Sequence, residues 1–294
     1  MISVVLSGGA IRGANQAGGL LRLHELKIPV ETVVGSSVGA LNGALFAQGD
    51  ASKLADVWLN EIRTSKDIYK EWFPWFTKKP WSYMNSITGY FRGGLYNTLP
   101  LATLINKYVD GMKLCYSNIK YACCVVDPHG EYDPDGKNDP RKIFIENKNT
   151  NYDRIKDYVL ASASVPIVFP PVKRDGRHLV DGGLLEPVPV KYAIENSKSE
   201  NKIIIMLASR IHTLKQEIGQ NMISTVIATV NTLINKTFAD DIDKGLLIYG
   251  WDAGRFRIFK TKNYFVDSFD VDHDKIRRSF DDGYKLMGEI CASL

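Results

Sequence analysis

The chain has 294 residues, of which 45% are hydrophobic, and its formal net charge is +4 at pH 7. This length and apolar content are typical of one large α/β domain with a substantial buried core. The charge is small, and Lys and Arg form no dense cluster interleaved with aromatic residues, so nucleic acid is not an expected partner. No apolar run is long enough to span a bilayer, so a transmembrane segment is not expected.

The first predicted unit is a buried strand over residues 2–6, a glycine-rich turn, and an amphipathic helix over about residues 14–26. The turn, residues 7–13, reads Ser-Gly-Gly-Ala-Ile-Arg-Gly and exposes backbone donors to an anion. Its spacing is not that of the dinucleotide fingerprint, and it lacks the Walker lysine. The turn is therefore either an oxyanion site or a plain turn. No basic or long apolar leader precedes the strand, which favours a cytoplasmic location.

The second predicted strand, residues 32–34, runs into a Gly-x-Ser-x-Gly motif at residues 35–39. Small apolar residues then follow at helical spacing, so the pattern indicates a sharp strand-to-helix turn with Ser37 at its apex. Such a turn requires Gly35 and Gly39, because a Cβ at either position would collide with the neighbouring strand or helix. The motif alone also fits a glycine turn without chemistry. In a parallel sheet, both glycine turns would open at the carboxyl ends of the strands, where α/β proteins place their sites.

A helix is predicted over residues 50–65, and the most aromatic stretch of the chain, residues 68–84, follows it. Aromatic side chains alternate there with lysines, at Trp72, Phe73, Trp75, Phe76 and Trp81. This pattern fits a membrane-interface surface or the cover of an apolar pocket, and equally an insertion packed on its own core. Residues 95–108 carry a further predicted helix, with Leu99, Leu104 and Ile105 as its apolar positions.

Two strands are predicted at residues 121–126 and 143–145, joined by an acidic loop over residues 127–140. The loop oxygens could hold calcium, but the glutamate at the twelfth position of an EF-hand is missing, so a solvated turn is favoured and no metal is expected. The cysteines form no Cys-x-x-Cys pair, and we expect reduced core residues at Cys115, Cys123, Cys124 and Cys291.

A short helix is predicted over residues 153–163, and a serine- and proline-rich run continues to residue 172. Residues 179–181 then form an apolar strand that delivers Asp181 into the turn Gly182-Gly183, although Asp-Gly-Gly is also an ordinary hairpin signal. A buried strand at 203–207, a helix at 218–235, a strand at 256–259 and a helix at 274–292 complete the prediction. No linker or repeat divides the chain, so we expect one domain over residues 1–294.

In order and spacing, these blocks resemble the patatin-like phospholipase family over about residues 1–210. Residues 7–13 are similar to its oxyanion block, 35–39 to its nucleophile elbow, 94–101 to a segment between the elbow and the third block, 161–172 to that third block, and 181–183 to its Asp-Gly-Gly/Ala block. The resemblance implies a three-layer α/β fold with a central, mostly parallel sheet flanked by helices. Residues 211–294 would then be the C-terminal part of the same domain.

The resemblance also implies a lipid acyl hydrolase without a cofactor, acting on phospholipids or lysophospholipids at a peripheral membrane surface. Ser37 would be the nucleophile and Asp181 the base, in a dyad. The implied oxyanion positions are Gly8, Gly9, Ala10, Arg12 and Gly13, and the supporting glycines are Gly35, Gly39, Gly182 and Gly183. The family usually has Gly where this chain has Ala10, which restricts φ and adds a methyl group near the oxyanion. An aspartate at its ordinary pKa of about 3.9 is a weak base, so we expect the oxyanion donors to supply much of the rate enhancement.

Two alternatives remain. The first is an α/β-hydrolase triad that uses His212 or His273, against which the elbow follows the second strand of the chain. The five histidines are scattered and none has a partner motif; the others are His24, His129 and His178, and His178 is expected to be structural. The second alternative is a membrane-lipid-binding module on the same fold, without catalysis or with conditional activation.

Overall fold

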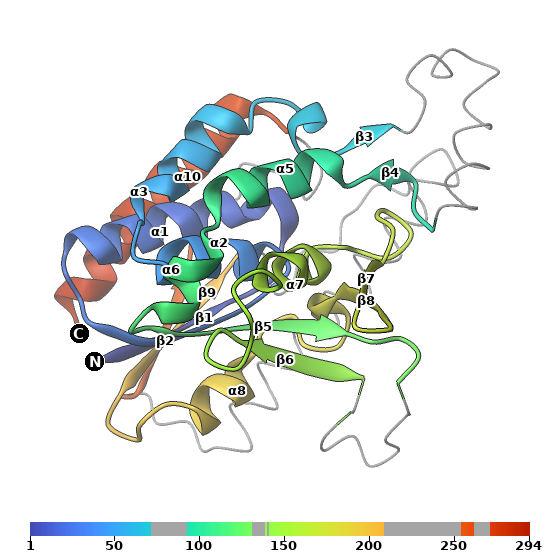
Figure 1. Cartoon of the computed structure of the whole chain (residues 1–294). Coiled ribbons are helices and arrows are strands. Elements are labelled where there is room, and N and C mark those ends of the chain that lie inside the picture. The colour runs from blue at the N-terminus through green and yellow to red at the C-terminus, as the bar shows by residue number, and fades with distance from the viewer. Residues whose placement is uncertain (72–92, 131–138, 140, 209–253, 262–270) are drawn as a thin grey trace.

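The computed structural model describes residues 1–71, 93–130, 139, 141–208, 254–261 and 271–294 (Figure 1). The strands are β1 (Ile2–Leu6), β2 (Val30–Ser36), β3 (Lys70–Glu71), β4 (Tyr96–Asn97), β5 (Lys120–Val126), β6 (Lys142–Glu146), β7 (Val172–Arg174), β8 (Arg177–Asp181), β9 (Lys202–Leu207) and β10 (Phe256–Lys260). The α-helices are α1 (Ala14–Glu25), α2 (Val38–Ala47), α3 (Ser52–Ala55), α5 (Leu99–Tyr108), α6 (Gly111–Tyr116), α7 (Ile155–Ser162), α8 (Val190–Glu195) and α10 (His273–Ala292). A π-helix covers Asp56–Glu61, and short 3-10 helices cover Ala10–Gly13, Ser65–Asp67 and Gly182–Leu184.

A mixed sheet of eight strands forms the centre of the described residues, in the order β10-β9-β1-β2-β5-β8-β7, with β6 also paired to β5. The strands from β10 to β5 are parallel to their neighbours, whereas β5 pairs antiparallel with both β6 and β8, and β8 with β7. The predicted α/β class with a mostly parallel sheet is confirmed.

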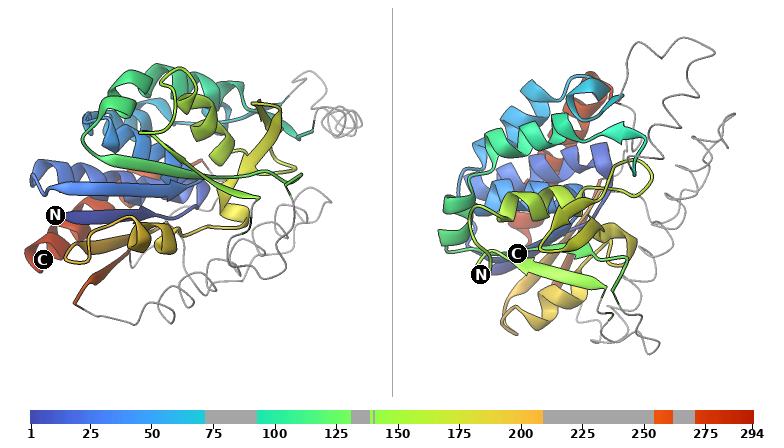
Figure 2. Two further views of the ribbon diagram at one scale, coloured as in Figure 1. Left: turned by 60° about the horizontal axis from the view of Figure 1, so that its bottom comes forward. Right: turned by 45° about the vertical axis from the view of Figure 1, so that its right-hand side comes forward.

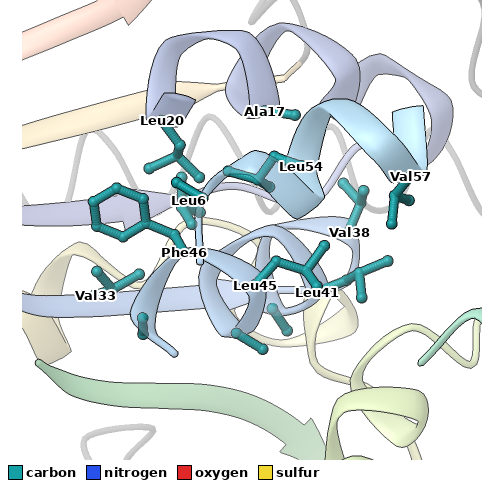
Figure 3. Close-up of a cluster of buried hydrophobic side chains, with 14 of the residues drawn as sticks. Leu6, Ala17, Leu20, Val33, Val38, Leu41, Leu45, Phe46, Leu54 and Val57 are labelled. Carbon is teal, nitrogen blue, oxygen red and sulfur yellow. The ribbon is translucent and has the colours of Figure 1, made fainter. Parts of the chain in front are cut away.

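Alternate residues of the buried strands face two different cores, as the two-residue period of a strand requires. Val4 and Leu6 of β1 face the larger core, whereas Val5 faces a smaller one. Helices α1, α2, α7 and α10 lie over the larger core, and α8 covers the other face of the sheet (Figure 1). Figure 3 shows the larger core between β1, β2 and the helices above them, where Leu6 and Val33 meet Leu20, Leu45 and Phe46. Each such side chain contributes roughly 1.5–3 kcal/mol when it is removed from water.

The helix predicted over residues 95–108 is shorter than expected. Tyr96 and Asn97 pair with β3, and α5 starts at Leu99, with Pro100 in its first turn, where a missing N–H costs nothing. Leu99 is 63% exposed, so its predicted core role is wrong, whereas Leu104 and Ile105 are buried. The helix predicted over residues 50–65 is shorter than expected: α3 passes into the π-helix at Asp56, and the helical backbone ends at Glu61, where Ile62 is extended. The predicted helix 218–235 lies outside the described residues, as does most of the acidic loop.

The strand register brings the chemically interesting residues to one edge of the sheet. Leu6 pairs with Gly35 across β1 and β2, Ser36 pairs with Cys124, and Val125 pairs with Asp181. The last residues of β1, β2 and β5 therefore meet the end of β8. Both chain termini lie together at the other end of the sheet (Figure 2).

Candidate active site

Ser37 sits on a strained turn between β2 and α2. Its backbone has φ 56° and ψ −128°, a region that non-glycine residues rarely adopt. A Cβ at Gly35 would lie 2.4 Å from the backbone of Gly39, and a Cβ at Gly39 would lie 2.4 Å from the carbonyl oxygen of Leu6. The expected collisions are therefore confirmed, and the two glycines let the helix start directly against the strand ends.

The glycine-rich turn after β1 packs directly against Ser37. An added Cβ at Gly8 would lie 3.3 Å from the Ser37 Cβ, and one at Gly13 would lie 2.5 Å from Val38. Gly9 and Ala10 both have positive φ, 157° and 50°, so Ala10 adopts the left-handed conformation that its methyl group disfavours. The strained backbone at Ala10 thus lies in the turn that packs against Ser37.

Among the described residues, the backbone N–H groups of Gly9, Ala10 and Ile11 in this turn have no hydrogen-bond acceptor. The Gly8 N–H donates to the Pro187 carbonyl at 3.0 Å, and the Arg12 N–H donates to the Gly9 carbonyl at 3.2 Å. Gly9 and Ala10 donate to no acceptor in the part of the chain that the structure describes. Of the predicted oxyanion positions, the N–H groups of Gly8 and Arg12 are thus already bonded within the fold, whereas those of Gly9 and Ala10 have no described acceptor.

Asp181 ends β8 and is 1% exposed. Its Oδ1 accepts a hydrogen bond from the Gly183 N–H at 2.7 Å. Its Oδ2 is buried, and no group within the described ranges meets it at ordinary hydrogen-bond distance and angle, although the Ser37 hydroxyl is near enough to lower the Asp181 pKa. Oδ2 is therefore the carboxylate oxygen that has no hydrogen-bond donor among the described residues.

Burial raises the pKa of Asp181 to about 7, and the nearby Ser37 hydroxyl and the hydrogen bond from Gly183 oppose that rise only in part. A desolvated carboxylate without a cationic partner binds a proton more tightly than one in water. The expectation of an ordinary aspartate pKa is therefore wrong, and the carboxylate is a stronger base than the sequence indicated.

Two serines of the run at residues 161–172 form hydrogen bonds that connect the Ser37 turn, β5 and Asp181. The Ser162 hydroxyl accepts the Ser37 N–H at 3.1 Å and donates to the Cys124 carbonyl at 2.6 Å. The Ser164 carbonyl accepts the Asp181 N–H at 3.0 Å. In the sequence this run is recognised as a block, but these two roles were not predicted from it; its Ser-x-Ser spacing was the available signal.

A second link is the segment Glu186–Pro187, which was not predicted from the sequence either. The Ser36 hydroxyl donates to the Glu186 carbonyl at 2.5 Å, and Pro187 receives the Gly8 N–H. The Glu186 carboxylate is buried and pairs with Lys142 of β6 at 2.5 Å. An added Cβ at Gly182 would lie 2.2 Å from the Cys124 carbonyl, so this glycine lets the Asp181 turn approach β5. One buried segment thus positions the elbow, the glycine-rich turn and the Asp181 turn.

An apolar cavity of about 70 Å³ opens beside Ser37. Its walls come from the glycine-rich turn, α2, the π-helix, α5 and residues 163–169. Ala10 is part of the wall, so its methyl group lies at the site, as the sequence indicated. The described lining residues carry no charge.

The remaining predicted residues are not brought to this site by any described contact. His273 begins α10, where its Nδ1 lies 3.3 Å from the Ile62 carbonyl, and His178 packs edge-on against His129. His212 and the aromatic positions Trp72, Phe73, Trp75, Phe76 and Trp81 lie outside the described residues. Cys123 and Cys124 are buried free thiols, whereas Cys115 and Cys291 are half-buried. Among the described residues, no group suited to a metal ion is found, and no helix is long and apolar enough to cross a membrane.

Comparison with known proteins finds relatives that are named as patatin-like phospholipases and lysophospholipases. Patatin-like phospholipase domain-containing protein 7 of Rattus norvegicus is 27% identical over 194 residues, which cover 65% of this chain and 12% of the relative. Lysophospholipase NTE1 of Candida albicans is 27% identical over 192 residues, 64% of this chain and 12% of the relative. The chain thus spans about an eighth of the length of these curated relatives.

Among solved structures, VipD from Legionella pneumophila has the same fold, with a TM-score of 0.52 and 15% sequence identity. The match covers 99% of this chain and 67% of VipD. The family model of the patatin-like phospholipases matches residues 4–194, a range that holds both Ser37 and Asp181. The chain therefore belongs to the patatin-like phospholipase family.

Proposed function

We propose that this chain hydrolyses carboxylic ester bonds of phospholipids or lysophospholipids, with Ser37 as the nucleophile and Asp181 as the base. The observation that carries this proposal is the pairing of a serine on a strained turn with a buried carboxylate whose pKa is about 7. A general base works best when its pKa lies near the working pH. The apolar cavity beside Ser37 fits the acyl part of a lipid ester, and the substrate reaches the site from a lipid surface.

In the first step, the Ser37 Oγ attacks the ester carbonyl carbon and its proton passes to Asp181 Oδ2. The carbonyl oxygen becomes an oxyanion that accepts hydrogen bonds from the N–H groups of Gly9 and Ala10. Each such donor accelerates the reaction by roughly 100- to 1000-fold. The C–O bond to the leaving alcohol then breaks, and Asp181 returns its proton to that oxygen. An acyl-enzyme on Ser37 and a lysophospholipid, or a glycerophospho-alcohol, are formed.

In the second step, water replaces the alcohol. Asp181 Oδ2 takes a proton from the water as its oxygen attacks the acyl carbon, and the same two N–H groups bind the second oxyanion. The bond from the acyl carbon to Ser37 Oγ breaks, and Asp181 gives the proton to Ser37. A fatty acid leaves and the site returns to its starting protonation.

The test is fatty-acid release from mixed phospholipid vesicles, followed by mass spectrometry. Ser37→Ala and Asp181→Asn should both reduce release to background while the proteins stay folded. Matched controls are Ser199→Ala and Asp175→Asn, both at exposed positions, which should retain activity. His273→Ala should also retain it.

Loss of activity in a folded His273→Ala variant would mean that the site uses a catalytic triad and not a dyad. If wild type releases nothing from vesicles or from short soluble esters, the hydrolase proposal fails. Vesicle co-sedimentation of that inert protein would then support a lipid-binding module.

A further inference from the structure

We infer that Trp58 closes the acyl cavity and limits the length of the acyl chain that this site accepts. The inference rests on the proposed ester hydrolysis, because it assigns the cavity to the acyl part of the substrate. It concerns the end of the cavity away from the reacting atoms, so it predicts substrate preference and not the presence of activity.

The burial of the lining residues places Trp58 at the closed end. Trp58 is 1% exposed, the lowest value among the described lining residues, whereas Ser37 is 8% exposed and Tyr69 and Ala163 are half-buried. Trp58 is therefore the least exposed part of the described wall, which fits the end that a chain entering beside Ser37 reaches last. Trp58 is also the largest side chain among the described lining residues, so its replacement changes this part of the cavity most.

The indole ring is held in place by hydrogen bonds. Its Nε1–H donates to Asn42 Oδ1 at 2.8 Å. The Asn42 amide group in turn donates to the Gly13 carbonyl at 2.9 Å and to Gln16 Oε1 at 3.3 Å. These partners are all buried, and a buried donor that loses its partner is costly, so the ring does not swing aside to admit a longer chain.

The backbone around Trp58 has an unusual geometry. Residues Asp56–Glu61 form a π-helix, a rare conformation that occurs often at functional sites. The widened turn carries Trp58, and Ile62, which follows it directly, also lines the cavity. The π-helix thus supplies adjacent parts of the same wall.

The chemistry of the lining selects an acyl chain over a headgroup. None of the described lining residues is charged, so a phosphate would lose its hydration without gaining a cation. Each CH₂ group that leaves water for an apolar cavity improves binding roughly fourfold. The cavity encloses only about 70 Å³, so this gain stops once the chain reaches Trp58.

The experiment measures kcat/KM on p-nitrophenyl esters from butyrate to palmitate. For wild type, kcat/KM should rise about fourfold per CH₂ and then level off or fall at an intermediate length. In Trp58→Leu the maximum should move to longer chains. Leu41→Ala, which enlarges the cavity from α2, should move it in the same direction.

Leu45→Ala is the matched control, because Leu45 lies one turn along α2, is equally buried in the core and does not line the cavity (Figure 3). It should lose stability without a change in the preferred chain length. An unchanged profile in both folded cavity variants, or an equal shift in Leu45→Ala, would overturn the inference.

A second readout separates this inference from the proposed hydrolysis. Calorimetric titration of Ser37→Ala with fatty acids of increasing length measures the cavity without turnover, alone and combined with Trp58→Leu. A length limit that Trp58→Leu extends supports the inference even if wild type hydrolyses no ester, in which case only the proposed function fails. Hydrolysis with no length limit in either assay overturns the inference and leaves the function standing.

Discussion

The backbone N–H of Ser37 donates a hydrogen bond to the hydroxyl of Ser162, 3.1 Å away and 125 residues further along the chain. The same hydroxyl donates to the Cys124 carbonyl at the end of β5. One buried side chain therefore fastens the strained turn to the strand that pairs with Asp181. The geometry of the proposed dyad depends on this link, because β8 reaches Ser37 only across β5.

Ser162→Ala should reduce both stability and activity. The substitution leaves the Ser37 N–H and the Cys124 carbonyl buried without this partner, at a cost of about 1–3 kcal/mol. We expect a fall in kcat larger than the change in KM, because the turn rather than the cavity is disturbed. Urea unfolding and ester hydrolysis measure the two effects.

The control is Ser164→Ala, because the Ser164 hydroxyl bonds only to the Leu160 carbonyl one turn earlier among the described contacts. It should lose less activity than Ser162→Ala. Equal losses in the two variants would mean that the link to Ser37 has no particular importance.

Activity should increase with pH through about 7, because only ionised Asp181 accepts a proton and its pKa is about 7. The stability effect has the opposite sign. The folded pKa lies above the ordinary aspartate value of 3.8, so the folded protein holds an extra proton between pH 3.8 and about 7. The stability that Asp181 contributes is fully present below pH 3.8 and is lost as pH rises through about 7.

Asp181→Asn removes this titration, so the free energy of unfolding of wild type should fall relative to the variant between about pH 5 and pH 8. Urea unfolding at the two pH values measures the difference, and a pH–rate profile of wild type measures the kinetic limb. A variant that keeps the wild-type pH dependence of stability would show that another group titrates.

The sequence was sufficient for the parts of the site that depend on local geometry. Close backbone contacts require glycine at positions 35 and 39. Because each glycine lies two residues from a serine, this requirement could be predicted from the sequence. The strands were readable because β1, β2 and β9 are short apolar runs bounded by turn residues.

The rest depended on tertiary contacts that no local pattern carries. The pKa of Asp181 follows from its complete burial, and the roles of Ser162 and Glu186 follow from hydrogen bonds to residues far away in the sequence. Leu99 matches the apolar pattern of α5, yet it is exposed because the helix starts there. The local sequence pattern thus predicted which residues lie near one another at the site. It did not predict how burial changes the pKa of Asp181 or which hydrogen bonds hold these residues in place.

The buried ion pair between Lys142 and Glu186 should respond unequally to loss of either partner. The Glu186 side chain is 7% exposed and the Lys142 side chain 22% exposed, so a stranded lysine reaches water more easily than a stranded glutamate. Lys142→Met should therefore destabilise by about 3–5 kcal/mol. Glu186→Gln should cost less.

A double-mutant cycle by urea unfolding checks this asymmetry. The double variant Lys142→Met/Glu186→Gln should recover part of the loss of Lys142→Met, because no buried charge is then left alone. Additive losses, or a larger loss from Glu186→Gln than from Lys142→Met, would contradict the burial argument.

Ala10→Gly should stabilise the protein by up to about 1 kcal/mol, since it removes the strain of a Cβ at φ 50°. It also removes a methyl group from the wall of the cavity, so hydrolysis should be retained or increased. The control with opposite sign is Ala17→Gly inside α1, which should destabilise by at least about 0.5 kcal/mol. Thermal unfolding of both variants measures these changes in stability. A destabilised Ala10→Gly variant would show that the turn does not need a residue in the left-handed conformation.

The most direct test of the proposed chemistry is to trap the nucleophile. Wild type is treated with a fluorophosphonate, which phosphonylates an activated serine with loss of fluoride, and the modified peptide is identified by mass spectrometry. We predict a single adduct on Ser37, lost in Ser37→Ala and formed much more slowly in Asp181→Asn at neutral pH. Fatty-acid release by a protein whose Ser37 stays unmodified, or an adduct on another residue that abolishes activity, would contradict the Ser37–Asp181 mechanism.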